Sequence, residues 1–198
     1  AVKETWVSLR ETGDTGWHQE EGSASLRKFW PRLAPGRRVL VPLCGKSADL
    51  LWLAGQGYSV TGVELSEIAA QAFFEEAGIH SAVSESDDSK RYRSREHHLE
   101  IVVGDYFGFA DEPFDALYDR ASLVALPPQM RPAYARHTNT LLKSGAAKLL
   151  LTLEYDQSMV AGPPFSVLSD EIGDYWPELS RVGKLCASGN MPPRFREA

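Results

Sequence analysis

The sequence contains few cysteines and no long apolar run. Its two cysteines, Cys44 and Cys186, are far apart and show no spacing typical of a zinc site. We therefore expect free thiols and no bound metal. No stretch approaches the roughly 18 apolar residues of a membrane-spanning helix, and the N-terminal stretch has no signal-peptide core. These absences predict a cytoplasmic protein without a membrane partner.

An excess of positive charge is also missing. The chain has 21 lysines and arginines against 27 aspartates and glutamates, a formal net charge of −6. This balance argues against a nucleic-acid partner, because such proteins carry a basic face. The length of 198 residues and the apolar content of 43% are ordinary for one globular domain. We therefore expect residues 1–198 to form a single domain and the acidic chain to be a monomer.

The most informative stretch begins with the apolar residues 39–43. This run is short and rich in β-branched residues, as is typical of a strand buried on both faces. Gly45 ends it, and an apolar pattern predicts a helix with Asp49 in its first turn. The next apolar run, residues 58–63, ends at Glu64, about 20 residues after the glycine. Because an acid there can accept hydrogen bonds from a ribose, the stretch predicts the adenosine-binding half of a doubly wound α/β domain.

Gly45 and Glu64 each have a simpler explanation when taken alone. The glycine can be merely a tight connection, and the carboxylate can be a solvated group at a strand end. Their spacing within one strand–helix–strand unit favours a nucleoside site. An NAD-dependent oxidoreductase is an alternative, because an acid here also suits the ribose of NAD, although the motif G-x-G-x-x-G is absent. A non-catalytic module that binds a nucleoside cofactor is a second alternative.

Strand-like and helix-like segments alternate along the rest of the chain. Strands are predicted at residues 99–103, 114–118, 147–155 and 181–186, and helices at residues 25–30, 66–77, 127–142 and from residue 169. This alternation predicts a doubly wound, mostly parallel sheet of the Rossmann-like type, with helices on both faces. Residues 1–30 are expected to form an N-terminal lid with a helical segment. The polar residues 84–98 are interpreted as a surface excursion.

In open α/β sheets, ligands bind beyond the carboxyl ends of the strands. The predicted strand ends carry Leu43, Gly45, Glu64, Asp105, Tyr106, Asp119, Arg120 and Glu154. A glycine turn, several acids and one arginine therefore meet at a single edge of the predicted sheet. This clustering is the argument for a site there. His97 and His98 lie outside it and are interpreted as solvent-exposed loop residues.

The motifs around these residues resemble the thiopurine S-methyltransferase family, a branch of the S-adenosylmethionine-dependent methyltransferases. The matching stretches are Gly16-Trp-His-Gln19, Val41-Pro-Leu-Cys-Gly-Lys-Ser47, Leu51-Trp52, Gly62-Val-Glu-Leu-Ser-Glu67, Gly104-Asp-Tyr-Phe107, Tyr118-Asp-Arg120, Leu123-Val-Ala-Leu-Pro-Pro128 and Gly162-Pro-Pro-Phe165. They follow one another in family order, and their combination is far more specific than any one piece.

The resemblance implies S-adenosylmethionine as cofactor and in-line methyl transfer to the sulfur of an aromatic or heterocyclic thiol. It implies cofactor contacts at Leu43, Gly45, Glu64, Asp105, Tyr106 and Arg120, and substrate contacts at Trp17 and Arg120. Glu64 would hold the ribose, Asp105 and Tyr106 would flank the adenine, and Trp17 would close the pocket. Arg120 is the predicted catalytic residue, because a fixed cation favours the thiolate form of the substrate. Its alternative role is a structural ion pair with a strand-end acid.

Two departures from the family pattern stand out. Arg10 occupies a position where the family usually has a tryptophan, and the final family strand is expected to be absent from this chain. The loop of residues 162–165 is interpreted as a stiff turn in preference to a ligand wall.

Overall fold

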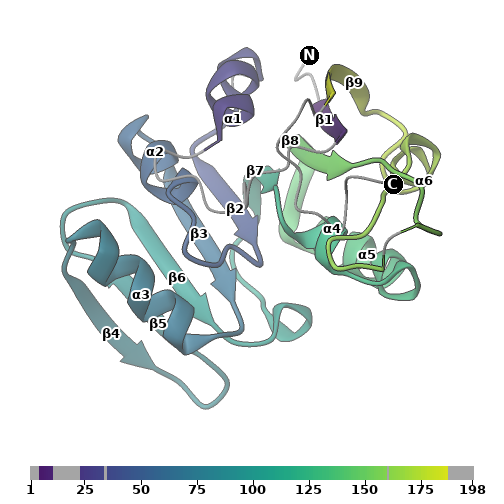
Figure 1. Cartoon of the computed structure of the whole chain (residues 1–198). Helices are drawn as coiled ribbons and strands as arrows, with labels where there is room; N and C mark the ends of the chain where they lie inside the picture. Colours follow the sequence, from purple (N-terminus) through teal and green to yellow (C-terminus); the bar gives the residue numbers. More distant parts are fainter. Residues whose placement is uncertain (1–4, 11–22, 34, 160, 187–198) are drawn as a thin grey trace.

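A computed structural model describes residues 5–10, 23–33, 35–159 and 161–186 of the chain. Over these ranges a nine-stranded sheet forms the centre of the molecule, in the order β4-β5-β6-β3-β2-β7-β8-β1-β9 (Figure 1). Its strands are β1 (Thr5–Arg10), β2 (Arg38–Pro42), β3 (Ser59–Glu64), β4 (Ser81–Glu85), β5 (Lys90–Ser94), β6 (Leu99–Val103), β7 (Phe114–Asp119), β8 (Leu142–Leu153) and β9 (Ser180–Cys186). The helices are α1 (Ala24–Phe29), α2 (Asp49–Gly55), α3 (Glu67–Ala77), α4 (Ser122–Ala125), α5 (Arg131–Leu141) and α6 (Ser169–Tyr175), with 3₁₀ turns at Trp30–Arg32, Tyr106–Gly108 and Pro128–Met130.

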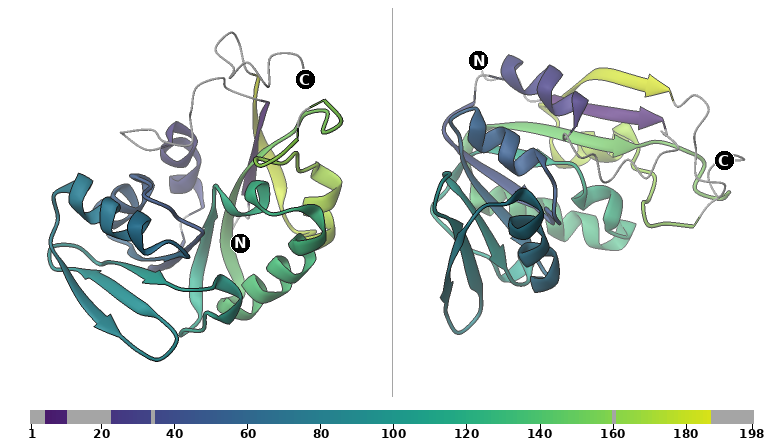
Figure 2. Two further views of the ribbon diagram at one scale, coloured as in Figure 1. Left: turned by 60° about the horizontal axis from the view of Figure 1, so that its bottom comes forward. Right: turned by 60° about the vertical axis from the view of Figure 1, so that its left-hand side comes forward.

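Helices cover both faces of this sheet. Strands β6, β3, β2, β7, β8, β1 and β9 run parallel, and β5 and β4 add an antiparallel edge. Helices α1 to α3 lie on one face and α4 to α6 on the other (Figure 2). Successive strand residues point to opposite faces, so Val39 and Val41 pack in the cluster with α1 to α3 and Leu40 packs with α5. This arrangement confirms the predicted doubly wound, mostly parallel α/β fold.

Helix α3 follows the local signals of the sequence closely. The side chain of Ser66 accepts a hydrogen bond from the backbone N–H of Ala69 at 3.2 Å and caps the helix. Gly78 ends the helix in the left-handed conformation, with φ of 66°. Phe73 and Phe74 are buried against the sheet, so capping and burial agree with the prediction for residues 66–77.

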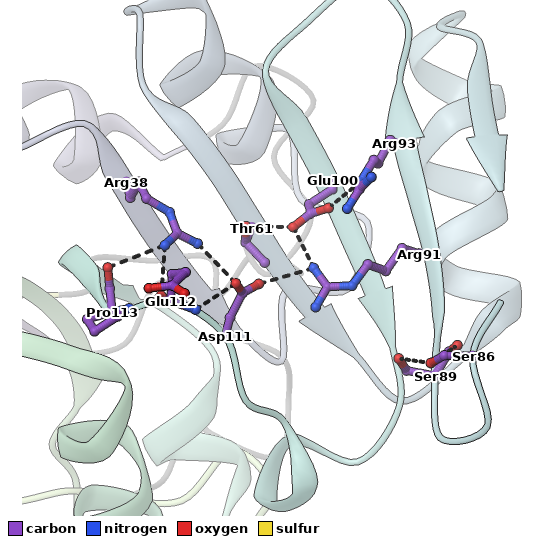
Figure 3. Close-up of polar contacts among 10 residues, drawn as sticks. All are labelled: Arg38, Thr61, Ser86, Ser89, Arg91, Arg93, Glu100, Asp111, Glu112 and Pro113. Atoms are coloured by element: carbon purple, nitrogen blue, oxygen red, sulfur yellow. Dashed lines mark hydrogen bonds and ion pairs between the residues drawn. The ribbon is translucent and has the colours of Figure 1, made fainter. Parts of the chain in front are cut away.

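Most of residues 84–98 are exposed, as the interpretation of a surface excursion requires, but they belong to the sheet and not to an irregular loop. This part of the chain contributes β5 and the end of β4, the antiparallel edge of the sheet. Its charges are paired: Arg91 contacts Glu100 at 2.9 Å and Asp111 at 3.1 Å, and Arg93 contacts Glu100 at 2.9 Å (Figure 3). Cross-strand pairs of opposite charge stabilise a sheet. The high charge density is thus a property of the edge hairpin.

The interpretation of residues 1–30 as a lid with a helical segment is wrong for residues 5–10. These residues form β1, which lies parallel to both β8 and β9 and pairs with both. Its register joins Thr5 to Leu149 and to Ser180, so its partners are distant in the sequence and left no local signal. The helical part is confirmed by α1, which Ser23 caps. Trp17 and Arg10 carry predictions that fall on residues or side chains outside the described part.

Candidate active site

The turn after β2 is held in an unusual backbone conformation. Leu43 has φ of 47° and Gly45 has φ of 55°, a region that costs energy for a residue with a Cβ atom. The backbone N–H of Cys44 donates to the carbonyl of Val63 at 3.1 Å, and the hydroxyl of Ser122 donates to the carbonyl of Pro42 at 3.0 Å. Contacts from both neighbouring strand ends therefore fix the turn.

Glu64 lies against this turn, as its spacing from Gly45 predicts. Its carboxylate accepts hydrogen bonds from the backbone N–H of Gly45 at 2.8 Å and of Ser66 at 3.0 Å, one at each oxygen. A carboxylate offers about four acceptor positions, so both oxygens keep capacity for two hydroxyl donors. The side chain is half-buried. Gly45 and Glu64 thus form one continuous polar surface at the ends of β2 and β3.

A cavity of about 410 Å³ opens at the same edge of the sheet, a volume within the range of small-molecule sites. Its lining consists of Val41, Pro42, Leu43, Cys44, Gly45, Lys46, Ser47, Asp49, Tyr118, Arg120, Ala121, Val124, Ala125, Pro163 and Pro164. The structure brings the predicted residues Leu43, Gly45 and Arg120 together there. Pro163 and Pro164 also line it, so the preference for a mere stiff turn at residues 162–165 is corrected.

Arg120 forms an ion pair, but not with its neighbour Asp119. Its Nη1 lies 3.2 Å from Oδ2 of Asp49, whose side chain is buried at the start of α2. The same oxygen accepts a hydrogen bond from the hydroxyl of Tyr118 at 2.7 Å. Side chains alternate along a strand, so Tyr118 and Arg120 face the cavity and Asp119 faces the opposite side. There the Asp119 carboxylate accepts bonds from the hydroxyl of Tyr134 at 2.6 Å and the N–H of Ser122 at 2.9 Å.

Asp119 predicts an effect of pH on stability. Burial raises the pKa of its carboxyl from 3.8 to about 6. Between these pH values the folded state keeps a proton that the unfolded chain loses, so this contribution to the free energy of unfolding falls as pH rises from about 4 to about 6. The destabilisation caused by Asp119→Asn should therefore be smaller at pH 7 than at pH 4, by about 2 to 3 kcal/mol. Urea unfolding at both pH values measures it, with the exposed Asp87→Asn as control. Equal costs at the two pH values would contradict the assignment.

The loop that carries Pro163 and Pro164 is tied down by several side chains. The hydroxyl of Tyr155 donates to the carbonyl of Pro164 at 2.6 Å, and the N–H of Phe165 donates to the carbonyl of Val124 at 2.6 Å. The fully buried Arg131 contacts the carbonyls of Leu123, Leu126 and Ser166 and the carboxylate of Glu171. The cavity wall is therefore held to α4 and α6 through charge-assisted hydrogen bonds.

Cys44 and Gly62 fit together where β2 and β3 meet. A Cβ atom on Gly62 would lie 2.6 Å from the Sγ of Cys44, so only glycine leaves room for the thiol. Burial, together with the nearby Glu64 carboxylate, raises the pKa of the Cys44 thiol well above its usual value. The thiol is therefore neutral at ordinary pH and not a nucleophile.

Gly62→Ala should lower the free energy of unfolding by about 1 to 3 kcal/mol, because the added methyl group overpacks this contact. Chemical denaturation measures the change. The double variant Gly62→Ala, Cys44→Ala removes the sulfur that the methyl group would meet. We expect it to recover at least half of the loss relative to Cys44→Ala alone. Strictly additive costs would show that the clash is not the cause.

Asp105 and Tyr106 follow β6, at the edge of the sheet where the prediction placed them. Asp105 is exposed and accepts a bond from the N–H of Phe107 at 3.0 Å. The Tyr106 ring is buried, with its hydroxyl 2.7 Å from that of Thr138, and burial raises the pKa of this phenol. The ring therefore belongs to the core, and only its backbone remains as the part that could flank an adenine.

The sequence motifs did not single out every residue at this edge. Asp49 was expected only as a first-turn residue of α2, yet its carboxylate lines the cavity. Leu65 is 76% exposed directly after Glu64. The sequence offers only a positional signal for each residue. Asp49 is an acid at the start of an apolar helix, and Leu65 is an apolar residue directly after a strand-end acid.

The described residues offer neither a metal site nor a membrane-spanning helix. Within these ranges, no group of three His, Cys, Asp or Glu side chains is arranged to hold a metal ion, and His97 and His98 are exposed. No helix in the same ranges has the length and apolarity needed to cross a bilayer.

Comparison with solved structures supports the fold. The chain is similar to TehB from Haemophilus influenzae, with a TM-score of 0.58, 17% identity, and coverage of 80% of this chain and 51% of that one. It is also similar to magnesium protoporphyrin IX methyltransferase from Synechocystis PCC 6803, with a TM-score of 0.54, 15% identity, and coverage of 77% and 63%. At these identities the likeness shows the fold alone.

Comparison with protein sequences identifies the family. The family model of thiopurine S-methyltransferase matches residues 1–197. The chain is 49% identical to a thiopurine S-methyltransferase of Pseudomonas putida over 172 residues, covering 84% of this chain and 79% of the relative. It is 47% identical to one of Bordetella petrii over 174 residues, covering 85% and 78%. These matches favour a methyltransferase over the oxidoreductase and non-catalytic alternatives. The chain belongs to the thiopurine S-methyltransferase family, whose methyl donor is S-adenosylmethionine.

Proposed function

We propose that this enzyme methylates the sulfur of an aromatic or heterocyclic thiol, in the cavity between the turn after β2 and Arg120. The single observation that carries the proposal is that the turn in contact with Glu64 and the guanidinium of Arg120 border one cavity. Leu43, Gly45 and Arg120 all line this cavity. The hydrogen bond from Gly45 to Glu64 places the carboxylate next to the same turn.

The residues at this edge fit an adenosyl group. Glu64 keeps acceptor positions for two ribose hydroxyls, and the backbone at Leu43 and Gly45 borders the cavity without a bulky obstruction at the glycine. The exposed Leu65 offers an apolar surface to a base, and Asp105 and the backbone of Tyr106 complete the adenine side. S-adenosylmethionine supplies an electrophilic methyl group on a positively charged sulfur, which the acceptor sulfur takes by in-line displacement.

For this reaction the protein has three tasks. It orients the acceptor sulfur toward the methyl group, excludes water from the cavity and favours the charged form of the acceptor. Val124, Ala125, Pro163 and Pro164 give the cavity apolar walls that exclude water and favour a flat, apolar acceptor. The Arg120 guanidinium favours the thiolate over the neutral thiol. Because heteroaromatic thiols are more acidic than aliphatic thiols, this assistance is sufficient without a separate general base. Trp17, outside the described residues, is proposed to close the site.

The direct test is methyl transfer by the purified chain. We expect labelled S-adenosylmethionine to methylate a mercapto-substituted heterocycle on sulfur, with a much lower rate for an aliphatic thiol of similar size. Mass spectrometry of the product locates the new methyl group. Methylation at nitrogen or oxygen, or equal rates for the two thiols, would contradict the proposed substrate class.

The proposal also takes the enzyme to be a monomeric, single-domain, cytoplasmic protein that acts on small molecules.

A further inference from the structure

Under the proposed function, the cavity must hold two positive charges at the same time. A guanidinium from Arg120 lines the space that must also receive a positively charged sulfonium. Two like charges in one poorly solvated site repel each other strongly. Lys46 adds a further ammonium to the lining, although it is exposed and forms an ion pair with Glu76 at 2.8 Å. Some negative charge is therefore needed close to Arg120.

Asp49 is placed to provide that charge. Among the described residues that line the cavity, it carries the one carboxylate. The residue is 1% exposed, which is rare for an aspartate unless its charge is paired. Its Oδ2 accepts from Arg120 Nη1 at 3.2 Å and from the Tyr118 hydroxyl at 2.7 Å, and its Oδ1 accepts from the backbone N–H of Ser23 at 2.5 Å.

These bonds connect three elements at the site. Asp49 starts α2, directly after the turn of Leu43 and Gly45; Arg120 follows β7; and Ser23 caps α1. Two of these three donors are neutral, and the third, the Arg120 guanidinium, is charged. A buried pair of this kind has a net charge near zero and fixes the direction of the guanidinium.

Resting on the proposed function, we propose that Asp49 is the counter-ion of the catalytic cavity. It positions Arg120 toward the acceptor, and its charge allows a cationic methyl donor to share the cavity with a guanidinium. S-adenosylmethionine carries a positive charge at sulfur, and the product S-adenosylhomocysteine does not. The charge of Asp49 should therefore matter more for the affinity of S-adenosylmethionine than for that of S-adenosylhomocysteine.

Equilibrium calorimetry with these two ligands tests the proposal without relying on turnover. Asp49→Asn removes the carboxylate that pairs with Arg120 in the cavity, so the affinity of this variant for S-adenosylmethionine should fall about tenfold more than its affinity for S-adenosylhomocysteine. Arg120→Met leaves Asp49 unneutralised and should shift the same ratio of affinities in the opposite direction. The double variant restores the charge balance and should bring the ratio back to within about threefold of the wild-type value.

Three further variants and controls separate charge from structure. Tyr118→Phe removes a neutral donor to the same oxygen and should leave the affinity ratio unchanged. Asp49→Glu keeps the charge and should restore most of the ratio lost in Asp49→Asn. Thermal unfolding of each variant confirms that it is folded, and the double variant tests the sign of the effect even where Asp49→Asn is poorly stable.

The outcomes are distinct. Equal losses of affinity for both ligands in Asp49→Asn would overturn the counter-ion role and leave the proposed function standing. A wild-type chain that binds neither ligand would overturn the proposed function, and the counter-ion role with it.

Discussion

Replacing Glu64 with alanine should weaken the binding of S-adenosylmethionine by at least about 100-fold. Hydrogen bonds to a charged acceptor contribute about 1.5 to 3 kcal/mol each, and the proposed site assigns two of them to the ribose. The carboxylate also accepts bonds from Gly45 and Ser66, so its removal loosens the turn that borders the nucleoside. Both effects act in the same direction. Calorimetric titration of the intact chain with S-adenosylmethionine measures the loss.

Two variants separate these contributions. Glu64→Gln keeps one acceptor oxygen and the shape of the side chain, so it should bind more weakly than the wild type and more tightly than Glu64→Ala. Glu75→Ala removes an exposed glutamate from the neighbouring helix α3 and serves as the matched control. If Glu64→Ala bound the donor within about threefold of the wild-type affinity, the ribose role of Glu64 would be rejected.

Arg120→Met should reduce turnover on an aryl thiol by about 100-fold at pH values below the pKa of that thiol. A charge-assisted hydrogen bond from the guanidinium, which the pairing with Asp49 leaves possible, favours the thiolate of the acceptor by about 1.5 to 3 kcal/mol. The side chain of Arg120 is 12% exposed, so solvent screens it only partly. Above the pKa the acceptor is ionised without assistance, and the loss should shrink to about tenfold or less.

The shape of the pH profile distinguishes this role from a structural one. The measurement is kcat for the wild type and Arg120→Met across the pKa of one aryl thiol, with Arg136→Met, exposed on α5, as the control. A loss of the same size at every pH would remove the thiolate role from Arg120. It would leave only the orientation that the ion pair with Asp49 supplies.

Local patterns were sufficient for the part of the fold that holds the nucleoside. The strand before Leu43, the turn at Gly45, the helix after it and the strand that ends at Glu64 are consecutive, so periodicity and spacing define them without knowledge of distant contacts. The same holds for α3, where the cap at Ser66 and the stop at Gly78 lie at its two ends.

Residues whose roles depend on distant partners were not predictable in this way. Asp49 and Arg120 form a contact although they are 71 positions apart in the sequence. No sequence pattern near Asp49 predicts this partner. Pro163 reaches the cavity because Tyr155 and Arg131 hold its loop in place. Strand β1 is ordered by pairing with β8 and β9. Its short sequence has strand-forming residues but no nearby segment with which to pair.

The charge-dense β5 illustrates a different error. Polar, charged sequence is typical of mobile surface segments, but opposite charges on adjacent strands also stabilise a sheet. Arg91 and Arg93 distinguish the two cases only once Glu100 is known to lie on the adjacent strand, opposite Arg93. The pairing of such a segment with a neighbouring strand, and not its amino-acid composition, determines whether it forms a strand or a loop.

A crystal structure of the chain with S-adenosylhomocysteine tests the central claim most directly. We predict the two ribose hydroxyls within hydrogen-bond distance of the Glu64 carboxylate and the ligand sulfur inside the cavity that Arg120 lines. A nucleoside bound away from the Gly45 turn, or a ligand sulfur directed out of that cavity, would contradict the account.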